Sequence, residues 1–428
     1  MKVACPVLRG PGLSNELGLP DQVSHKPAAV SVSFDEPNLV SAAGLVPVMR
    51  LAKDACLHGL ADEWLSVPTD KGANAGLKIA ARFLVNLARR APLFGTPTGE
   101  GFIFVDVDDT IVEVHGYQKQ GSGYGYSGVR GVNALLATAS TEDTAPVIVG
   151  QRLRKGGTNS ARGAKRFVTD ALATLKRTGT TGPVLCRFDS AYYGHAAVAA
   201  ALAGGADVSV TVRMDPAVKR AIAAVPESAW EAIEYTNAVF DEDSSTWISA
   251  AEVAEVEFTA FSSRKKSERI TGRLVVRRIP ELNPKVTEDQ PTLFDTHRFH
   301  AFFTTVPAAT LGSVAADKTH RKHARIEQVN ADLKDSALAH LPSGNFAANS
   351  AWLVAAVMAY NLTRTAGILA AGPFAKARTG TIRRKLINVP ARIVSSARRV
   401  RLRMPESWPW QAGWETLFTA THAPPQTA

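Results

Sequence analysis

The sequence predicts an α/β fold in which a mixed β-sheet is covered by helices. Apolar runs typical of buried strands lie at residues 102–107, 133–139 and 146–152. From residue 162 to residue 213, segments with helical periodicity then alternate with short strand-like segments. Three successive strands followed by helix–strand alternation imply one sheet with both strand directions and helices on its faces.

Changes in composition along the chain predict five regions. We expect a helical N-terminal region at 1–100, the first part of the main α/β domain at 101–213, a β-rich insertion at 214–296, the rest of the main domain at 297–370, and a basic C-terminal region at 371–428. The last region is notable because residues 375–404 contain ten Lys or Arg and no acid. A solvated surface alone does not explain so one-sided a charge distribution.

Individual elements follow from periodicity and from Pro or Gly breakers. Residues 1–35 are rich in Pro and Gly and predict little regular structure. We expect helices at 45–60, 77–91, 162–177, 195–203, 319–338 and 347–369, and further strands at 184–188, 207–213, 252–261, 273–278 and 299–305. The six glycines of residues 116–131 predict a loop or a glycine-laced hairpin.

Composition narrows the class of protein. The chain has 428 residues, a 45% hydrophobic share and a net charge of +10, which indicate a globular protein with an anionic partner, most simply nucleic acid. The longest uninterrupted apolar stretch, residues 351–360, is shorter than the ~20 residues of a spanning helix, so we expect no membrane partner. The N-terminus lacks the apolar core of a signal peptide, and three cysteines at unrelated spacings predict neither disulfides nor a metal site, so we expect a reducing, cytoplasmic compartment.

Three acidic residues lie at predicted structural boundaries. Asp108 closes the apolar run at 102–107, Asp189 closes the run at 184–188, and Glu327 lies on the amphipathic helix predicted at 319–338. Two carboxylates at strand ends and one on a helix can hold a pair of Mg²⁺ or Mn²⁺ ions, because such ions prefer oxygen ligands. A two-metal site performs in-line displacement on phosphodiesters.

The predicted helix at 319–338 presents two stripes. One stripe is apolar and comprises Ile326, Val329, Leu333 and Ala337, while the adjacent stripe is polar and comprises His320, His323, Glu327 and Lys334. Packing through the apolar stripe would turn Glu327 toward the sheet edge. Lys334, two turns further on, would then reach a phosphate.

The first acid is not decided by the pattern. In a regular strand Asp106 and Asp108 point to the same face, whereas Asp109 points away only if the strand continues that far. The residues alone therefore leave Asp106 and Asp108 as alternatives.

Several segments around these acids carry a family resemblance. They are Val-Asp-Val-Asp-Asp-Thr at 105–110, the His-Gly-Tyr-Gln step at 115–118, Arg-Phe-Asp-Ser-Ala-Tyr-Tyr-Gly at 187–194, Arg-Ile-Glu-Gln-Val-Asn-Ala-Asp-Leu-Lys at 325–334 and Trp-Pro-Trp at 408–410. Together they resemble the DDE transposases of bacterial insertion sequences, specifically the group-one DDE transposase domain, from about residue 32 to residue 418.

The resemblance implies roles for named residues. The family's Asp-x-Thr step falls on Asp108, its second acid on Asp189, and its Glu, separated by six residues from a Lys, on Glu327 and Lys334. It implies an RNase H-like catalytic domain with a β-rich insertion between the second and third acids. It also implies Mg²⁺- or Mn²⁺-dependent cut-and-paste movement of an element by strand cleavage and transfer, with a homodimer on paired ends in the nucleoid. Relatives often carry Tyr and Arg upstream of the Glu, where this chain has His320 and His323.

Basic residues outside the acids predict contacts with double-stranded DNA, both the terminal inverted repeats and the target, because Lys and Arg contacts with phosphates supply most non-specific affinity. The candidates are Lys334, Arg325, Arg264, Lys265, Lys266, Arg383, Arg384, Arg398 and Arg399. The N-terminal helical region is a further candidate for DNA binding.

Two other functions fit part of the pattern. The run ending Asp106-Val-Asp108 also matches the opening of haloacid-dehalogenase phosphatases, in which the first Asp is the nucleophile. That fold would need a later acidic pair at a strand end, and Glu327 with Lys334 would have no role. A catalytically impaired relic that only binds DNA is the second alternative, because the helical region before the first strand is short.

Overall fold

The computed structural model describes residues 30–36, 42–64, 73–95, 101–116, 118–125, 127–234, 239–241, 246–248, 251–280, 297–396 and 399–422. The chain divides into two compact units. The larger unit is Leu51–Ile382, and the smaller one combines Met1–Arg50 with Arg383–Ala428.

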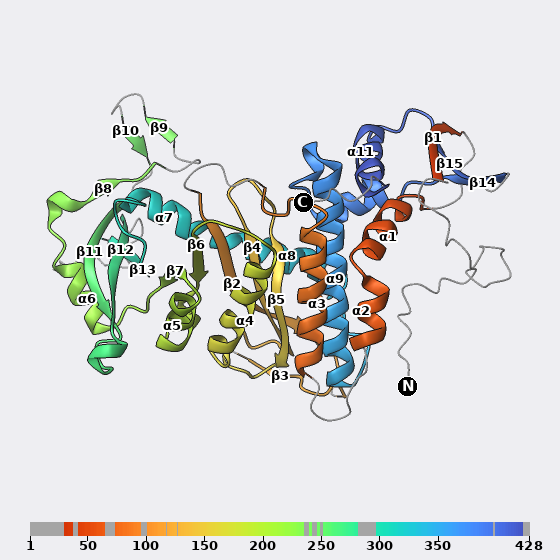
Figure 1. Cartoon of the computed structure of the whole chain (residues 1–428). Helices are drawn as coiled ribbons and strands as arrows, with labels where there is room; N and C mark the ends of the chain where they lie inside the picture. Colours follow the sequence, from red (N-terminus) through yellow and green to blue (C-terminus); the bar gives the residue numbers. More distant parts are fainter. Residues whose placement is uncertain are drawn as a thin grey trace. The chain divides into compact units, whose positions relative to one another are not determined.

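The larger unit is built on one mixed sheet (Figure 1). Along the sheet the order is β3 (Gly123–Tyr124), β4 (Arg130–Ser140), β2 (Ile103–Glu113), β6 (Val184–Phe188), β7 (Ala206–Thr211), β13 (His297–Thr304), β12 (Ile270–Pro280), β11 (Glu252–Ala260) and β8 (Glu231–Ala232), with β5 (Val147–Lys155) paired to β4. The pairs β2–β6 and β6–β7 are parallel, and the other pairs are antiparallel. The predicted mixed sheet is confirmed.

The strands of the region predicted as an insertion extend this sheet. β12 pairs with β13, and β13 pairs with β7, so β11 and β12 continue the central sheet. A short hairpin of β9 (Val239–Asp241) and β10 (Thr246–Ile248) forms a separate two-stranded sheet.

Helices flank the sheet of the larger unit (Figure 1). They are α2 (Leu57–Trp64), α3 (Ala73–Ala88), α4 (Ala164–Arg177), α5 (His195–Ala203), α6 (Pro216–Ala223), α7 (Ser313–Arg321), α8 (Arg325–Lys334), α9 (Phe346–Ala370) and α10 (Thr379–Ile382). α3 and α9 pack against each other and against β5, while α4 and α5 pack together against β5 and β7. α7 lies against β11 and β12, and α8 lies against β2.

The central strands are buried on both faces. Val105 and Val107 on β2 and Leu135 and Leu136 on β4 are fully buried. Strands covered on both faces read as continuous apolar runs, which is why they were recognisable in the sequence.

α9 is a core helix despite its apolar sequence. By length and composition it could cross a membrane, but 67% of its most apolar window is buried inside the protein. The buried Asn361 accepts from the backbone N–H of Ile148 and donates to the carbonyl of the same residue, both at 2.8 Å. These bonds to the backbone of Ile148 fix α9 against β5.

The smaller unit contains a three-stranded sheet. β1 (Val30–Glu36) pairs in parallel with β15 (Arg399–Pro405), which pairs with the antiparallel β14 (Arg392–Ser396). β1 thus begins within the stretch predicted to be weakly structured, and residues 1–29 lie outside the described residues. A π-helical turn at Arg383–Ile387 and α11 (Gln411–His422) complete it, and Trp414 is fully buried against Phe418.

The predicted helix at 45–60 is two helices. α1 (Leu45–Asp54) and α2 are separated at Cys56, which adopts a φ of 60°. A non-glycine residue in this left-handed region interrupts regular helix geometry.

Candidate functional site

Asp108 and Asp189 lie beside each other on neighbouring strands. The prediction that Asp108 ends its strand is wrong, because β2 continues to Glu113 along β4. On its other side, however, β2 loses its partner at this point, since Val107 pairs with Phe188, the last residue of β6. Asp108 follows Val107 and Asp189 follows Phe188, so the two acids lie side by side where β6 ends.

The carboxylate of Asp108 is held from two sides. One oxygen accepts from the backbone N–H of Asp109 at 2.7 Å, and the other accepts from the side-chain amide of Asn330 on α8 at 3.1 Å. The pKa of Asp108 is raised to about 6, chiefly by burial; the charges of Asp189 and Asp109 also raise it, while the Asp109 N–H and His323 act in the opposite direction. Burial therefore makes the ionised form of the Asp108 side chain unfavourable.

Asp189 is fixed by the turn that follows it. Its side chain accepts from the backbone N–H of Ala191 at 3.0 Å and so caps the 3₁₀ turn Ser190–Tyr192. Burial raises its pKa as well, and the charge of Asp109 adds to this, against the Ala191 hydrogen bond and His323. Two carboxylates whose charges are both disfavoured form a site that a cation would stabilise.

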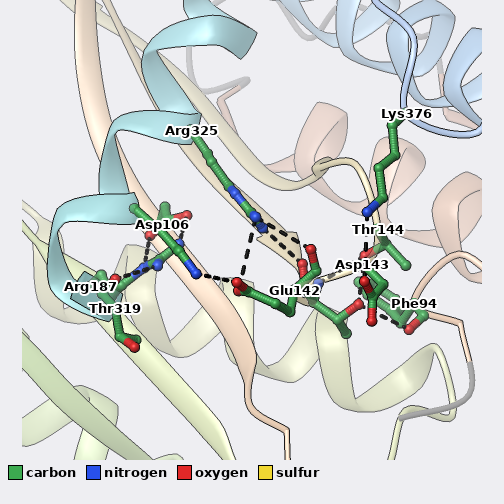
Figure 2. A network of polar contacts seen from close by, with 11 residues as sticks. Phe94, Asp106, Glu142, Asp143, Thr144, Arg187, Thr319, Arg325 and Lys376 are labelled. Atoms are coloured by element: carbon green, nitrogen blue, oxygen red, sulfur yellow. Dashed lines mark hydrogen bonds and ion pairs between the residues drawn. The ribbon is translucent and has the colours of Figure 1, made fainter. Parts of the chain in front are cut away.

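Asp106 is committed to another partner. Its two oxygens accept from Nε and Nη2 of Arg187, both at 2.7 Å, and the side chains are 1% and 0% exposed. Figure 2 shows the pair below α7 and α8. An Asp enclosed in this way is a poor metal ligand and a poor nucleophile, so the geometry disfavours both Asp106 as first acid and the phosphatase alternative.

Asp109 points to the opposite side of β2. It accepts from Arg154 at 2.9 Å and from the Tyr192 hydroxyl at 3.1 Å, and it also accepts from the side-chain amide of Asn133. Arg154 is buried here, so it offers no surface for DNA. Alternation along the continuing strand accounts for the opposite directions of Asp108 and Asp109.

The helix predicted at 319–338 is broken. α7 ends at Arg321, a 3₁₀ turn occupies Lys322–Ala324, and α8 starts at Arg325. The apolar stripe remains, since Ile326, Val329 and Leu333 are buried.

The predicted polar stripe does not remain on one face. His320 lies partly buried between Ser209 and Thr211, with ring nitrogens 2.8 and 2.9 Å from their hydroxyls, and its ring stacks on Phe302 at 4.2 Å. Loss of solvent around the ring lowers its pKa to about 3. The prediction of one continuous helical polar stripe is wrong, because the turn at Lys322–Ala324 separates α7 from α8, although His320 and Glu327 line the same cavity.

Glu327 shares a cleft with Asp189. Both line a cavity of about 270 Å³ together with His323, whose Nε2 lies 3.3 Å from the Val107 carbonyl oxygen. Glu327 is exposed on the first turn of α8. Among the described residues, no three His, Cys, Asp or Glu side chains already lie close enough together to hold a metal ion. The structure thus brings Asp108 beside Asp189, and it brings Glu327 to a cleft that Asp189 also lines.

The residues predicted to contact DNA differ in their exposure and in their partners. Lys334 is exposed in the last turn of α8. Arg325 instead donates to the backbone carbonyls of Thr141 at 2.9 Å and Glu142 at 3.3 Å, so it joins α8 to the β4–β5 loop (Figure 2). Its observed role is a structural one.

The remaining basic candidates lie at the surface. Arg264, Lys265 and Lys266 are exposed in the turn between β11 and β12, where Arg264 also pairs with Glu268 at 3.4 Å. Arg383, Arg384 and Arg399 are exposed in the smaller unit, and Arg398 lies outside the described residues.

Some residues of the site were missed in the sequence. Asn330 lies three positions after Glu327, a helical spacing that could have revealed it. Arg187 lies on β6 two positions before Asp189, but its pairing with Asp106 depends on the strand register, which no local pattern reveals.

Comparison with protein-family models identifies the family of this chain. Residues 89–423 match the family described as Transposase DDE domain group 1. Among solved structures, the chain is similar to a piggyBac transposase in a synaptic complex with hairpin DNA, with 10% identity, a TM-score of 0.40, and coverage of 80% of this chain and 69% of that one. The comparison with curated proteins gave no match.

Proposed function

Because the chain belongs to the group 1 DDE transposases, which cleave and join DNA with divalent metal ions, we propose that Asp108, Asp189 and Glu327 are its catalytic acids and that it moves an insertion sequence by cut-and-paste transposition. The observation that carries this proposal is the register of β2 and β6, which makes Asp108 and Asp189 neighbours beside the Glu327 cleft. We further propose that the central strands and their helices form an RNase H-like catalytic domain.

The chemistry of the donors fits Mg²⁺ or Mn²⁺. Asp108 and Asp189 offer hard carboxylate oxygens, and burial disfavours their unbalanced negative charge. When bound, two such ions activate the attacking oxygen and stabilise the leaving oxygen of a phosphodiester. Glu327, being exposed at the cleft, is free to turn inward and complete the ligand set.

The protein contributes rigidity and charge around these acids. Asn330 and the Asp109 N–H hold the Asp108 carboxylate in one orientation, and the Ala191 N–H does the same for Asp189. Lys334 presents a positive charge on the same helix as Glu327, in position for a phosphate of the DNA end. The exposed basic turn between β11 and β12 would hold DNA alongside, and a homodimer would pair two ends.

The test uses purified protein and labelled DNA fragments that carry the sequences flanking this reading frame. With Mg²⁺ we expect cleavage at defined positions in the flanks, and with EDTA none. Asp108→Asn, Asp189→Asn and Glu327→Gln should each reduce cleavage to background and leave DNA binding nearly unchanged, because each removes a metal ligand and no phosphate contact. Asp335→Asn, which alters an exposed carboxylate just after α8, is the matched control and should cleave normally.

Two outcomes would contradict the proposal. Release of phosphate from small phosphoesters, with no nicking of DNA in Mg²⁺, would favour a phosphatase. Cleavage by Asp108→Asn together with an inactive Asp106→Asn would move the first ligand to Asp106.

A further inference from the structure

Arg187 makes three hydrogen bonds from a fully buried position. Besides the paired bonds to Asp106, its Nη1 donates to the backbone carbonyl of Thr319 at 2.7 Å (Figure 2). Its guanidinium carbon also lies 4.2 Å from the centre of the Phe104 ring. One side chain thus connects β6, β2 and α7.

The bond to Thr319 satisfies a helix end. Thr319 lies in the last turn of α7, where backbone carbonyls lack intrahelical partners. An arginine near a helix C-terminus satisfies such a carbonyl and also interacts favourably with the helix dipole. The next residue, His320, anchors the same turn to β7 and β13. The end of α7 is therefore fixed just before the turn that leads into α8.

The positions of these residues relative to the acids are regular. Asp106 and Arg187 pair across β2 and β6, each two residues before Asp108 and Asp189 respectively. By strand alternation, Asp106 and Asp108 point to the same face. Thr319 precedes Glu327 by eight residues, across the Lys322–Ala324 turn. Each member of the network lies a short, rigid distance upstream of one acid.

We propose that Asp106, Arg187 and the Thr319 carbonyl form a positioning clamp that sets the distances among Asp108, Asp189 and Glu327. This inference rests on the proposed metal-binding role of those acids. Asp106 and Arg187 are positioning residues, since neither reaches the cleft that Asp189 and Glu327 line.

A purely stabilising role is a weaker explanation of the pair. Burying two charges costs solvation energy, and replacing a buried ion pair by apolar residues of similar size is often neutral or stabilising. The planar arginine fork gives fixed bond directions that an apolar pair lacks. The clamp therefore supplies geometry in addition to any stability.

The experiment replaces both partners at once, in the full chain. Asp106→Leu/Arg187→Met keeps the buried volume apolar and leaves no unpaired charge. We expect this variant to fold and to bind DNA like the wild type. At saturating DNA, its cleavage rate should fall by on the order of 10²-fold, the loss produced by a misplacement of about 1 Å, with little change in KM.

Metal binding gives a second readout that does not depend on cleavage. In a titration with Mn²⁺ followed by electron paramagnetic resonance, we expect the double variant to bind about 10-fold more weakly, as for changes in groups that orient metal ligands. Arg187→Lys keeps the charge without the fork and should give an intermediate Mn²⁺ affinity.

The matched control is Glu255→Leu/Arg273→Met. Arg273 also contacts a carboxylate, that of Glu255, and donates to two carbonyls, those of Val306 at 2.8 Å and Leu311 at 2.7 Å, but it joins β11 and β12 to the segment before α7. This control should retain the wild-type rate and Mn²⁺ affinity.

The outcomes separate the two proposals. A folded double variant with wild-type cleavage and Mn²⁺ affinity overturns the clamp and leaves the transposase proposal intact. Wild-type protein that never cleaves DNA overturns the proposed function, while Mn²⁺ affinities still test the clamp. If the double variant does not fold, wild-type Mn²⁺ affinity of Arg187→Lys overturns the clamp, and weakened affinity supports it.

Discussion

His320 should make the stability of the fold depend on pH in a way that one substitution removes. The ring is partly buried, stacks on Phe302 and hydrogen-bonds with Ser209 and Thr211, and loss of solvent around it lowers its pKa from 6.5 to about 3. In the unfolded chain the ring binds a proton as the pH falls below 6.5, whereas the folded protein stays unprotonated down to about pH 3. Between these values the unfolded state binds more protons, so acid destabilises the fold.

The size of this effect follows from the two pKa values. Lowering the pH from 7.0 to 5.5 should remove roughly 1 kcal/mol of unfolding free energy through His320 alone. Asp108 acts in the opposite direction, because its folded pKa of about 6 lies above the ordinary value of 3.8. Over the same interval, proton uptake by Asp108 in the folded state should return part of this loss. The wild-type protein therefore shows only part of the His320 effect.

The assay isolates His320 by difference. Urea unfolding of wild type and of His320→Phe, which keeps an aromatic ring against Phe302, is measured at pH 7.0 and 5.5. The variant loses hydrogen bonds at both pH values, but the difference in unfolding free energy between the two proteins should narrow by roughly 1 kcal/mol at the lower pH. An unchanged gap would refute the reasoning, as would a His320 ring signal that titrates in the folded protein near pH 6.5 in ¹⁵N NMR.

Two further substitutions test the fold and the DNA surface. Gly156→Ala should lower the unfolding free energy by about 1–3 kcal/mol in the same urea assay, because a Cβ there would meet the backbone oxygens of Gly131 and Gly123; an unaffected midpoint would contradict the tight packing of these strands. Lys265→Ala/Lys266→Ala should reduce the slope of log affinity against log salt by about 0.9 per lysine in DNA binding, whereas Lys176→Ala on α4 should not, and equal slopes would show that the β11–β12 turn does not touch phosphates.

Much of the sheet could be predicted from the sequence because its strands are buried on both faces. β6 and α5 have the predicted bounds, since an apolar run and an alanine-rich helix end at clear breakers. The continuation of β2 through Asp108, Asp109 and Thr110 could not be predicted in this way. These polar residues are tolerated in a strand because Asp109 accepts hydrogen bonds from Arg154, Asn133 and Tyr192. These three partners come from other elements of the fold.

The helical stripe through His320 shows the limit of periodicity. The spacing of His320, His323 and Glu327 fits a single helix face, yet the hydroxyls of Ser209 and Thr211 on β7 satisfy both ring nitrogens of His320. The chain accommodates this by a 3₁₀ turn at Lys322–Ala324. Periodicity predicts the face that packs, as Ile326, Val329 and Leu333 do, but tertiary hydrogen bonds decide where a helix breaks.

The three aspartates of β2 show how neighbouring side chains determine roles that the sequence pattern leaves open. Asp106 meets Arg187 and Asp109 meets Arg154, so a protein cation already balances each of these charges. Among the described residues, no ion pair joins Asp108 or Asp189 to a basic side chain. Electrostatic balance at the end of β6 therefore requires a proton or an added cation, and the raised pKa of both carboxyls expresses that requirement. Because Arg187 neutralises Asp106, Asp108 remains, beside Asp189, as the carboxylate to which a metal ion would bind.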